Sequence, residues 1–290
     1  MGLLRFSTIA ELRRHLDGRR RSGATVALVP TMGALHPGHA SLIERAVRDG
    51  SEEVATTIFV NPLQFGVNED LEQYPRDLAG DTALALAAGA TVLFTPSVEE
   101  MYPFGPTNVL TSVSVGALTN VLDGLARPGH FDGVATVVAK LFAIGGTCRA
   151  YFGEKDYQQL AVIRRMAIDL SFPVDVVGCP TVREANGLAL SSRNRYLSAD
   201  ERERASVIRR ALDAGVAAVA EGARGGDVSA TMHAVLAGES VVRSVDYAAC
   251  VDANTLADVN EITTEVRLLV AARVGSARLI DNCGAVPPAG

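Results

Sequence analysis

The sequence has no long apolar run and no excess of positive charge. Its most apolar stretch, residues 134–144, is interrupted by Lys140 and is far shorter than the ~20 residues that a membrane-spanning helix needs. Lys and Arg number 27 against 33 Asp and Glu, a formal net charge of -6 at pH 7, so the broad basic surface that non-specific nucleic-acid binding requires is missing. Charged residues also interrupt residues 1–18, where a secretion signal needs an apolar core. We therefore expect a cytoplasmic protein that binds neither membranes nor nucleic acid.

Cysteine and lysine are also scarce. The four cysteines form no CxxC pair and no Cys/His cluster, which argues against a disulfide framework or a zinc site and indicates reduced core thiols. Lys140 and Lys155 are the only lysines among 27 cationic residues. A lysine at a turn therefore suggests that a compact, flexible ammonium group is needed there. The cysteines are Cys148, Cys179, Cys250 and Cys283.

Over residues 1–180, short apolar runs alternate with longer amphipathic segments. The apolar runs are rich in β-branched residues and predict buried strands at 25–29, 54–60, 91–94, 149–152 and 174–177. The amphipathic segments predict helices at 39–49, 77–88, 133–144 and 156–170. Such alternation is typical of an α/β fold, here a Rossmann-like, doubly wound parallel sheet spanning residues 1–180.

The pattern changes after Pro180. A polar segment at 181–197 precedes Arg-rich helical runs to about residue 222, a helix at 227–237 and strands at 245–251, 266–272 and 279–282. Helices followed by strands predict a smaller C-terminal α+β domain, residues 181–290, which we expect to act as a lid. A chain of 290 residues with 48% hydrophobic residues is long enough for two such domains.

The segment Pro30–His39 follows the first buried strand directly and contains two glycines and two histidines. A helix that begins near Pro37 would present its N-terminus there, which is a favourable place for an anion. His36 and His39 would both face it and could donate N–H groups to phosphate oxygens. A plain turn with two solvated histidines is the alternative, and a metal site is less favoured because no third His or Cys is near in sequence.

Four motifs occur in one order along the chain. The string PTMGALHPGH contains the HxGH signature of the nucleotidylyl-transferase superfamily, and as a whole it resembles the pantothenate synthetase family. NPLQF at 61–65, GEKDYQQ at 153–159 and SSRNRYL at 191–197 resemble further segments of that family. The similarity extends from about residue 5 to Leu197, and the last 90 residues are only loosely diagnostic.

The resemblance implies a role for each motif. Gln64 and Gln159 would hold pantoate, with Asn61 and Arg127 also close to the substrates. ATP and Mg²⁺ would be the nucleotide partners, and we assign no protein metal ligand, because Asp77 and Asp81 are more simply explained as carboxylates at a helix start. Donors to the phosphates would be His36, His39, Lys155, Ser191, Ser192 and Arg193, with His39 as the best proton donor. The remaining ATP-binding residues would be Met32, Gly33, Ala34, Leu35, Pro37, Gly38, Gly153, Glu154, Asp156, Val182 (at the adenine) and Leu190.

The implied activity is an ATP-dependent ligase that joins pantoate to β-alanine. A carboxylate is a poor acylating agent, so AMP would first be transferred to pantoate, releasing pyrophosphate, and the amine of β-alanine would then displace AMP. Family members are usually homodimers through the first domain, which implies a homodimer here. Two alternatives are an adenylyltransferase that keeps the nucleotide on its product and a non-catalytic nucleotide sensor.

Overall fold

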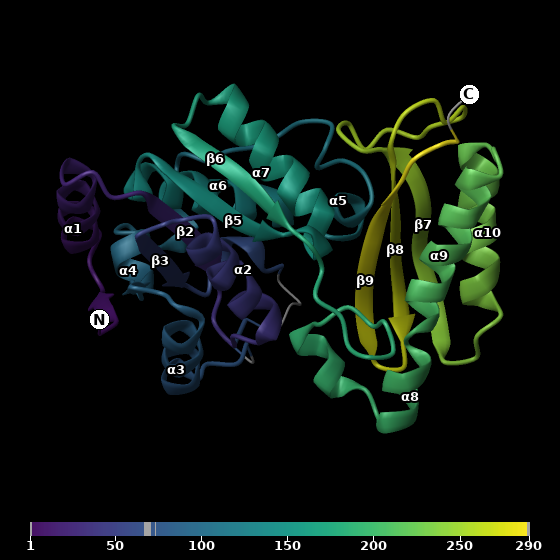
Figure 1. Cartoon of the computed structure of the whole chain (residues 1–290), viewed down its shortest axis with the longest axis horizontal. Helices are drawn as coiled ribbons and strands as arrows, with labels where there is room; N and C mark the ends of the chain where they lie inside the picture. The colour runs from purple at the N-terminus through teal and green to yellow at the C-terminus, as the bar shows by residue number, and fades with distance from the viewer. Residues whose placement is uncertain (1, 67–70, 73, 289–290) are drawn as a thin grey trace. The chain divides into compact units, whose positions relative to one another are not determined.

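The computed structural model describes residues 2–66, 71–72 and 74–288, and the chain forms two compact units (Figure 1). Unit 1 comprises Met1–Gly153 and Gln159–Pro180, and unit 2 comprises Glu154–Gln158 and Thr181–Gly290. The short segment Glu154–Gln158 therefore groups with the C-terminal part of the chain, although it lies between two parts of unit 1 in sequence.

Unit 1 is built on a six-stranded parallel sheet with the strand order β1-β4-β3-β2-β5-β6. The order runs outward from β2 in both directions, so the loops after β2 and β5 leave the sheet at a topological switch point, where ligands bind in open α/β sheets. The strands are β1 (Leu4–Phe6), β2 (Val26–Thr31), β3 (Glu53–Ile58), β4 (Val92–Phe94), β5 (Cys148–Gly153) and β6 (Val174–Cys179).

Helices cover both faces of this sheet. Alternate residues of a strand point to opposite faces: Ala27 and Val29 of β2 join the core formed with α2 and α3, and Leu28 lies beside Gly145 at the end of α6. This is the doubly wound arrangement that the sequence predicts. The helices are α1 (Ile9–Arg21), α2 (Pro37–Arg48), α3 (Leu78–Ala88), α4 (Val98–Met101), α5 (Asp123–Ala126), α6 (His130–Gly145) and α7 (Tyr157–Asp169).

Unit 2 has helices on one side of a three-stranded antiparallel sheet, in the order β7-β8-β9. Val207 and Leu212 of α9, Met232 of α10 and Leu268 of β8 are among the buried residues of its core. This confirms the predicted smaller α+β part. The elements are α8 (Ala199–Arg204), α9 (Val207–Ala220), α10 (Gly225–Ala237), β7 (Val242–Asp252), β8 (Val266–Val274) and β9 (Ala277–Ala285).

All predicted strands and helices are present, with ends shifted by a few residues. Helix α1, strand β1 and the short helices α4 and α5 lie outside the predicted ranges. Strand β1, α4 and α5 have only three or four residues, which carry too little periodicity to be recognised. Within the described part of the chain, no helix combines the length and apolarity needed to cross a membrane.

Candidate active site

The loop that follows β2 is held in place by Asp81 of α3. The two carboxylate oxygens of Asp81 accept backbone N–H groups of Ala34 at 3.0 Å and Leu35 at 2.6 Å. Gly33 has φ +83°, and a Cβ there would lie 2.9 Å from Asp81 Oδ2 and 3.1 Å from Cγ2 of Ile58. Glycine is therefore required for both conformation and space.

Asp77 and Asp81 have different roles, although both were expected to be carboxylates at a helix start. Asp77 is the N-cap of α3 and accepts the N–H of Gly80 at 2.9 Å, as expected. Asp81 lies in the first turn of α3, as expected. It is only 4% exposed, and its carboxylate also binds the backbone of the loop after β2, a role that was not predicted. Among the described residues, no group of three or more His, Cys, Asp or Glu could hold a metal ion.

His36 and His39 cap the N-terminus of α2 together. Nδ1 of His36 accepts the N–H of Gly38 at 3.1 Å, and Nδ1 of His39 accepts the N–H of His36 at 3.3 Å. The two rings lie 4.1 Å apart between centroids. Because each Nδ1 accepts a backbone proton, the proton of each neutral ring is on Nε2. Both imidazoles are thus fixed as Nε2–H donors at the N-terminus of a helix that follows the central strand.

The side chain of Gln64 is oriented by Asn61. Asn61, only 1% exposed, donates from Nδ2 to Oε1 of Gln64 and to the carbonyl of Gly133, both at 3.1 Å. Its Oδ1 accepts the hydroxyl of Tyr102 at 2.7 Å. The amide nitrogen of Gln64 then points toward Met32, with 3.0 Å between Nε2 and Sδ. The 3-10 turn η1 (Pro62–Gln64) is thereby joined to the loop after β2.

Two further features keep this cluster in place. Burial raises the pKa of Tyr102 well above its usual range, so its hydroxyl keeps the proton that it donates to Asn61. Gly133 allows α6 to approach η1 closely, since a Cβ there would lie 2.2 Å from the carbonyl oxygen of Leu63. Neither Tyr102 nor Gly133 was identified from the sequence, because their importance depends on contacts with distant residues.

His130 links Arg127 to the turn η1, which contains Gln64. Nη1 of Arg127 is 2.9 Å from Nε2 of His130, and Nδ1 of His130 is 2.8 Å from the carbonyl oxygen of Gln64. Since arginine can only donate, His130 accepts at Nε2 and donates from Nδ1. The structure therefore brings together Arg127, Gln64, Asn61 and Met32. Gln159 lies on a different element, in the first turn of α7, and is partly buried.

The predicted phosphate-binding residues of unit 2 lie on two turns. Lys155 belongs to the 3-10 turn η3 (Glu154–Asp156), with its Nζ 3.6 Å from Oδ1 of Asp156. Val182 and Leu190 face each other in a hairpin, because the N–H of Leu190 donates to the carbonyl of Val182 at 2.9 Å. Ser191 follows at once and caps η4 (Ser192–Tyr196) by accepting the N–H of Arg193 at 3.2 Å.

The predicted site residues thus form two sets. Unit 1 holds one set around the loop after β2 and η1, and unit 2 holds the other on η3 and the hairpin. The set in unit 1 is Met32–His39, Asn61, Gln64, Arg127, Gly153 and Gln159, and the set in unit 2 is Glu154–Asp156, Val182 and Leu190–Arg193.

Comparisons with known proteins agree over nearly the whole chain. The sequence model of the family described as pantoate-beta-alanine ligase matches residues 5–284. Pantothenate synthetase of Rhizorhabdus wittichii is 52% identical over 281 residues, which are 96% of this chain and 97% of that protein. Pantothenate synthetase of Thermus thermophilus is 52% identical over 287 residues, covering 97% of this chain and 99% of that protein.

Solved structures give the same result. The crystal structure of pantothenate synthetase from Thermus thermophilus has a TM-score of 0.89 at 49% identity and covers 99% of this chain and 100% of that one. Pantoate-beta-alanine ligase from Francisella tularensis, complexed with beta-gamma ATP and beta-alanine, has a TM-score of 0.77 at 31% identity over 97% of each chain. The fold and these matches define an enzyme of the ligase class. The chain belongs to the pantoate–β-alanine ligase family.

Proposed function

We propose that this enzyme condenses pantoate with β-alanine at the expense of ATP and forms pantothenate. The observation that carries the proposal is the pair His36 and His39, fixed as Nε2–H donors at the start of α2, with the amide of Gln64 linked to the same loop. Family membership supports the substrates, and the Francisella relative in complex with beta-gamma ATP and beta-alanine supports ATP and the amine.

The reaction has two steps in this proposal. A carboxylate oxygen of pantoate attacks the α-phosphorus of ATP, the bond from that phosphorus to the bridging oxygen breaks, and pyrophosphate leaves. The nitrogen of β-alanine then attacks the acyl carbon of pantoyl adenylate, loses a proton, and AMP leaves. Negative charge builds up on phosphate oxygens in the first step, so prepositioned donors lower its barrier. His39 donates to the departing phosphate oxygens.

Gln64 and its neighbours form the binding site for pantoate in this proposal. Oε1 of Gln64 already accepts a hydrogen bond from Asn61. The group that Gln64 can offer a substrate is therefore its N–H donor, which is directed at the sulfur of Met32. Thioether sulfur is a weak acceptor, and a carboxylate or hydroxyl oxygen of pantoate replaces it favourably. Arg127 supplies positive charge beside the same turn, and Gln159 is the second amide that holds pantoate.

The ATP phosphates receive further donors from unit 2. Lys155 provides an ammonium group, Ser191 and Ser192 provide hydroxyls, and Arg193 provides a guanidinium that can bind two phosphate oxygens at once. Val182 contacts the adenine in this proposal. Mg²⁺ accompanies ATP as the ion that its phosphate oxygens bind, and we assign it no protein ligand.

Isotope exchange tests this mechanism. Enzyme with ATP, Mg²⁺ and pantoate, but without β-alanine, is expected to exchange labelled pyrophosphate into ATP, and exchange is expected to stop when pantoate is omitted. The complete mixture should yield pantothenate and AMP. Release of ADP and phosphate would contradict the adenylate mechanism, a stable nucleotide-bearing product would indicate an adenylyltransferase, and ATP binding without turnover would indicate a nucleotide sensor.

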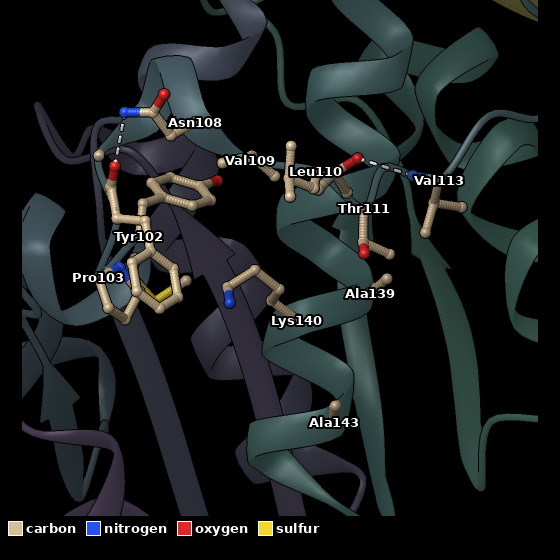
Figure 2. Close-up of a pocket in the computed structure, with 14 residues that line it drawn as sticks. Tyr102, Pro103, Asn108, Val109, Leu110, Thr111, Val113, Ala139, Lys140 and Ala143 are labelled. Atoms are coloured by element: carbon tan, nitrogen blue, oxygen red, sulfur yellow. Dashed lines mark hydrogen bonds between the residues drawn. The ribbon is translucent and has the colours of Figure 1, made fainter.

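We also propose that the enzyme is a cytoplasmic homodimer joined through unit 1. A cavity of about 970 Å³ opens beside Tyr102 and α6 (Figure 2), and two apolar side chains on its lining, Phe104 and Leu110, are 83% and 100% exposed. Large exposed apolar side chains grouped at one place favour a protein interface. Light scattering should give twice the chain mass for the wild type and a lower mass for Leu110→Asp, and a monomeric wild type would overturn this part.

A further inference from the structure

Strand β9 carries two adjacent polar residues in the interior of unit 2. Asp281 is 4% exposed and Asn282 is 3% exposed. Successive side chains of a strand point to opposite faces, so the two residues reach different neighbours. Burying polar groups is unfavourable unless they are hydrogen-bonded. Each residue has at least one partner on a segment that the proposed function assigns to ATP: Asn282 reaches the Glu154–Lys155 turn, and Asp281 reaches Arg183 in the hairpin.

Asn282 holds the backbone around Lys155. Its Nδ2 donates to the carbonyl of Glu154 at 3.0 Å and to the carbonyl of Lys155 at 2.8 Å, so both amide protons are used. Its Oδ1 accepts from Nε of Arg267 at 2.8 Å, and Arg267 also reaches the carboxylate of Glu154 at 3.2 Å. The two carbonyls belong to the peptide groups on either side of the Lys155 Cα, and fixing them fixes the direction in which its side chain leaves the backbone.

Asp281 holds the hairpin formed by residues 182–190, which directly precedes Ser191 and Ser192. Its two oxygens accept both terminal nitrogens of Arg183, at 2.5 and 3.0 Å, which is the geometrically specific bidentate pairing of arginine with a carboxylate. Nη1 of Arg183 also donates to the carbonyl of Gly187 at 3.1 Å. Arg183 therefore ties the Val182–Leu190 hairpin to β9, and Ser191 begins where this hairpin ends.

We propose that Asp281 and Asn282 are positioning residues of the reaction, which fix the spacing between Lys155 and the Ser191–Arg193 segment by tying both to one strand. The inference rests on the proposed function, since it takes these two segments as binders of the ATP phosphates. Neither residue acts on ATP directly: Asn282 acts through the Lys155 backbone and Asp281 through Arg183. A misplacement of about 1 Å in such donors is enough to lower a rate by roughly a hundredfold.

Asn282→Asp is the informative variant. It keeps the size of the side chain and the acceptor for Arg267 but removes both protons that reach the carbonyls. We expect kcat to fall by roughly ten- to a hundredfold and KM for ATP to rise, while KM for pantoate changes less than about twofold. The matched control is Asp246→Asn. Asp246 of β7 forms an ion pair at 2.6 Å with Arg278 of β9, the strand that carries Asn282, and its loss is expected to leave kcat and both KM values within about twofold.

A double variant separates positioning from a general effect on folding. If Asn282 acts through Lys155, Asn282→Asp should reduce activity little further in a Lys155→Ala background. Equal fold-losses in both backgrounds, or kcat of Asn282→Asp within twofold of wild type, would overturn the inference. Should Asn282→Asp not fold, Asp281→Asn gives the second test, with an increase in KM for ATP expected and an unchanged KM overturning the inference. A wild type that makes no pantothenate from pantoate, β-alanine and ATP would overturn the proposed function itself.

Discussion

Replacement of Asp81 by Asn removes one support of the loop that carries Met32–His36. The carboxylate accepts two backbone N–H groups, whereas an amide can accept at one oxygen and turns its NH₂ group toward the other N–H. Hydrogen bonds to charged groups contribute about 1.5–3 kcal/mol each, and an unsatisfied buried donor costs about 1–3 kcal/mol. We expect Asp81→Asn to lower the free energy of unfolding by about 2–4 kcal/mol, which corresponds to a decrease in Tm of roughly 4–16 °C.

Calorimetry at constant pH measures this change, and turnover should decrease with it because the loop no longer holds the histidines at one place. Asp77→Asn is the matched control on the same helix, since asparagine is as good an N-cap as aspartate and should leave both Tm and turnover almost unchanged. Equal melting temperatures for the two variants would refute the assignment of Asp81 as the support of this loop.

Other variants and conditions test the rest of the site. His39→Ala should still fold, with a small decrease in Tm from the lost cap of α2, and should lose on the order of a hundredfold or more in turnover; near-normal turnover would contradict its assignment. Tyr102→Phe should raise KM for pantoate but not for ATP, because the amide pair that orients Gln64 loses a hydrogen bond. Addition of ATP and pantoate should slow amide hydrogen exchange over residues 181–197, and equal exchange with and without ligands would argue against closure of this segment. The hydrogen bond from Arg202 holds the pKa of Glu184 below its usual value despite partial burial, so the difference in Tm between wild type and Glu184→Gln should be constant above about pH 5 and shrink as the pH falls through the lowered pKa.

The fold could be predicted almost completely from local patterns. The central strands are short and largely apolar, because both faces of a parallel sheet are buried, and helices such as α2 show the apolar spacing that packing against the sheet requires. The segment Glu154–Gln158 shows the limit of such reasoning. Its sequence indicates a turn after β5. The carbonyls of Glu154 and Lys155 are bound by the side chain of Asn282, and a local sequence pattern cannot indicate a partner more than a hundred residues away.

The sequence predicts which groups could meet a substrate, because glycines, histidines and amides directly after strands form local patterns. It did not locate the groups that hold them. Asp81, Tyr102, Asp281 and Asn282 lie in elements that appear ordinary, and their roles depend on tertiary hydrogen bonds alone. Asn61 was predicted to lie near the substrates, and the structure shows its side chain engaged with Gln64 and Tyr102.

The path of the chain through Glu154–Gln158 has a consequence for dissecting the protein. A single cut at Pro180 would leave these five residues on the N-terminal fragment, without Asn282 and without the carbonyl of Ala253 that binds the Tyr157 hydroxyl. The C-terminal fragment would keep Arg267, whose guanidinium stacks 3.9 Å from the Tyr157 ring centroid in the whole chain, with that aromatic partner gone. Neither fragment would therefore keep all the contacts that its residues make in the whole chain. A C-terminal unit for separate study has to include residues 154–158, either fused to it or added as a separate peptide.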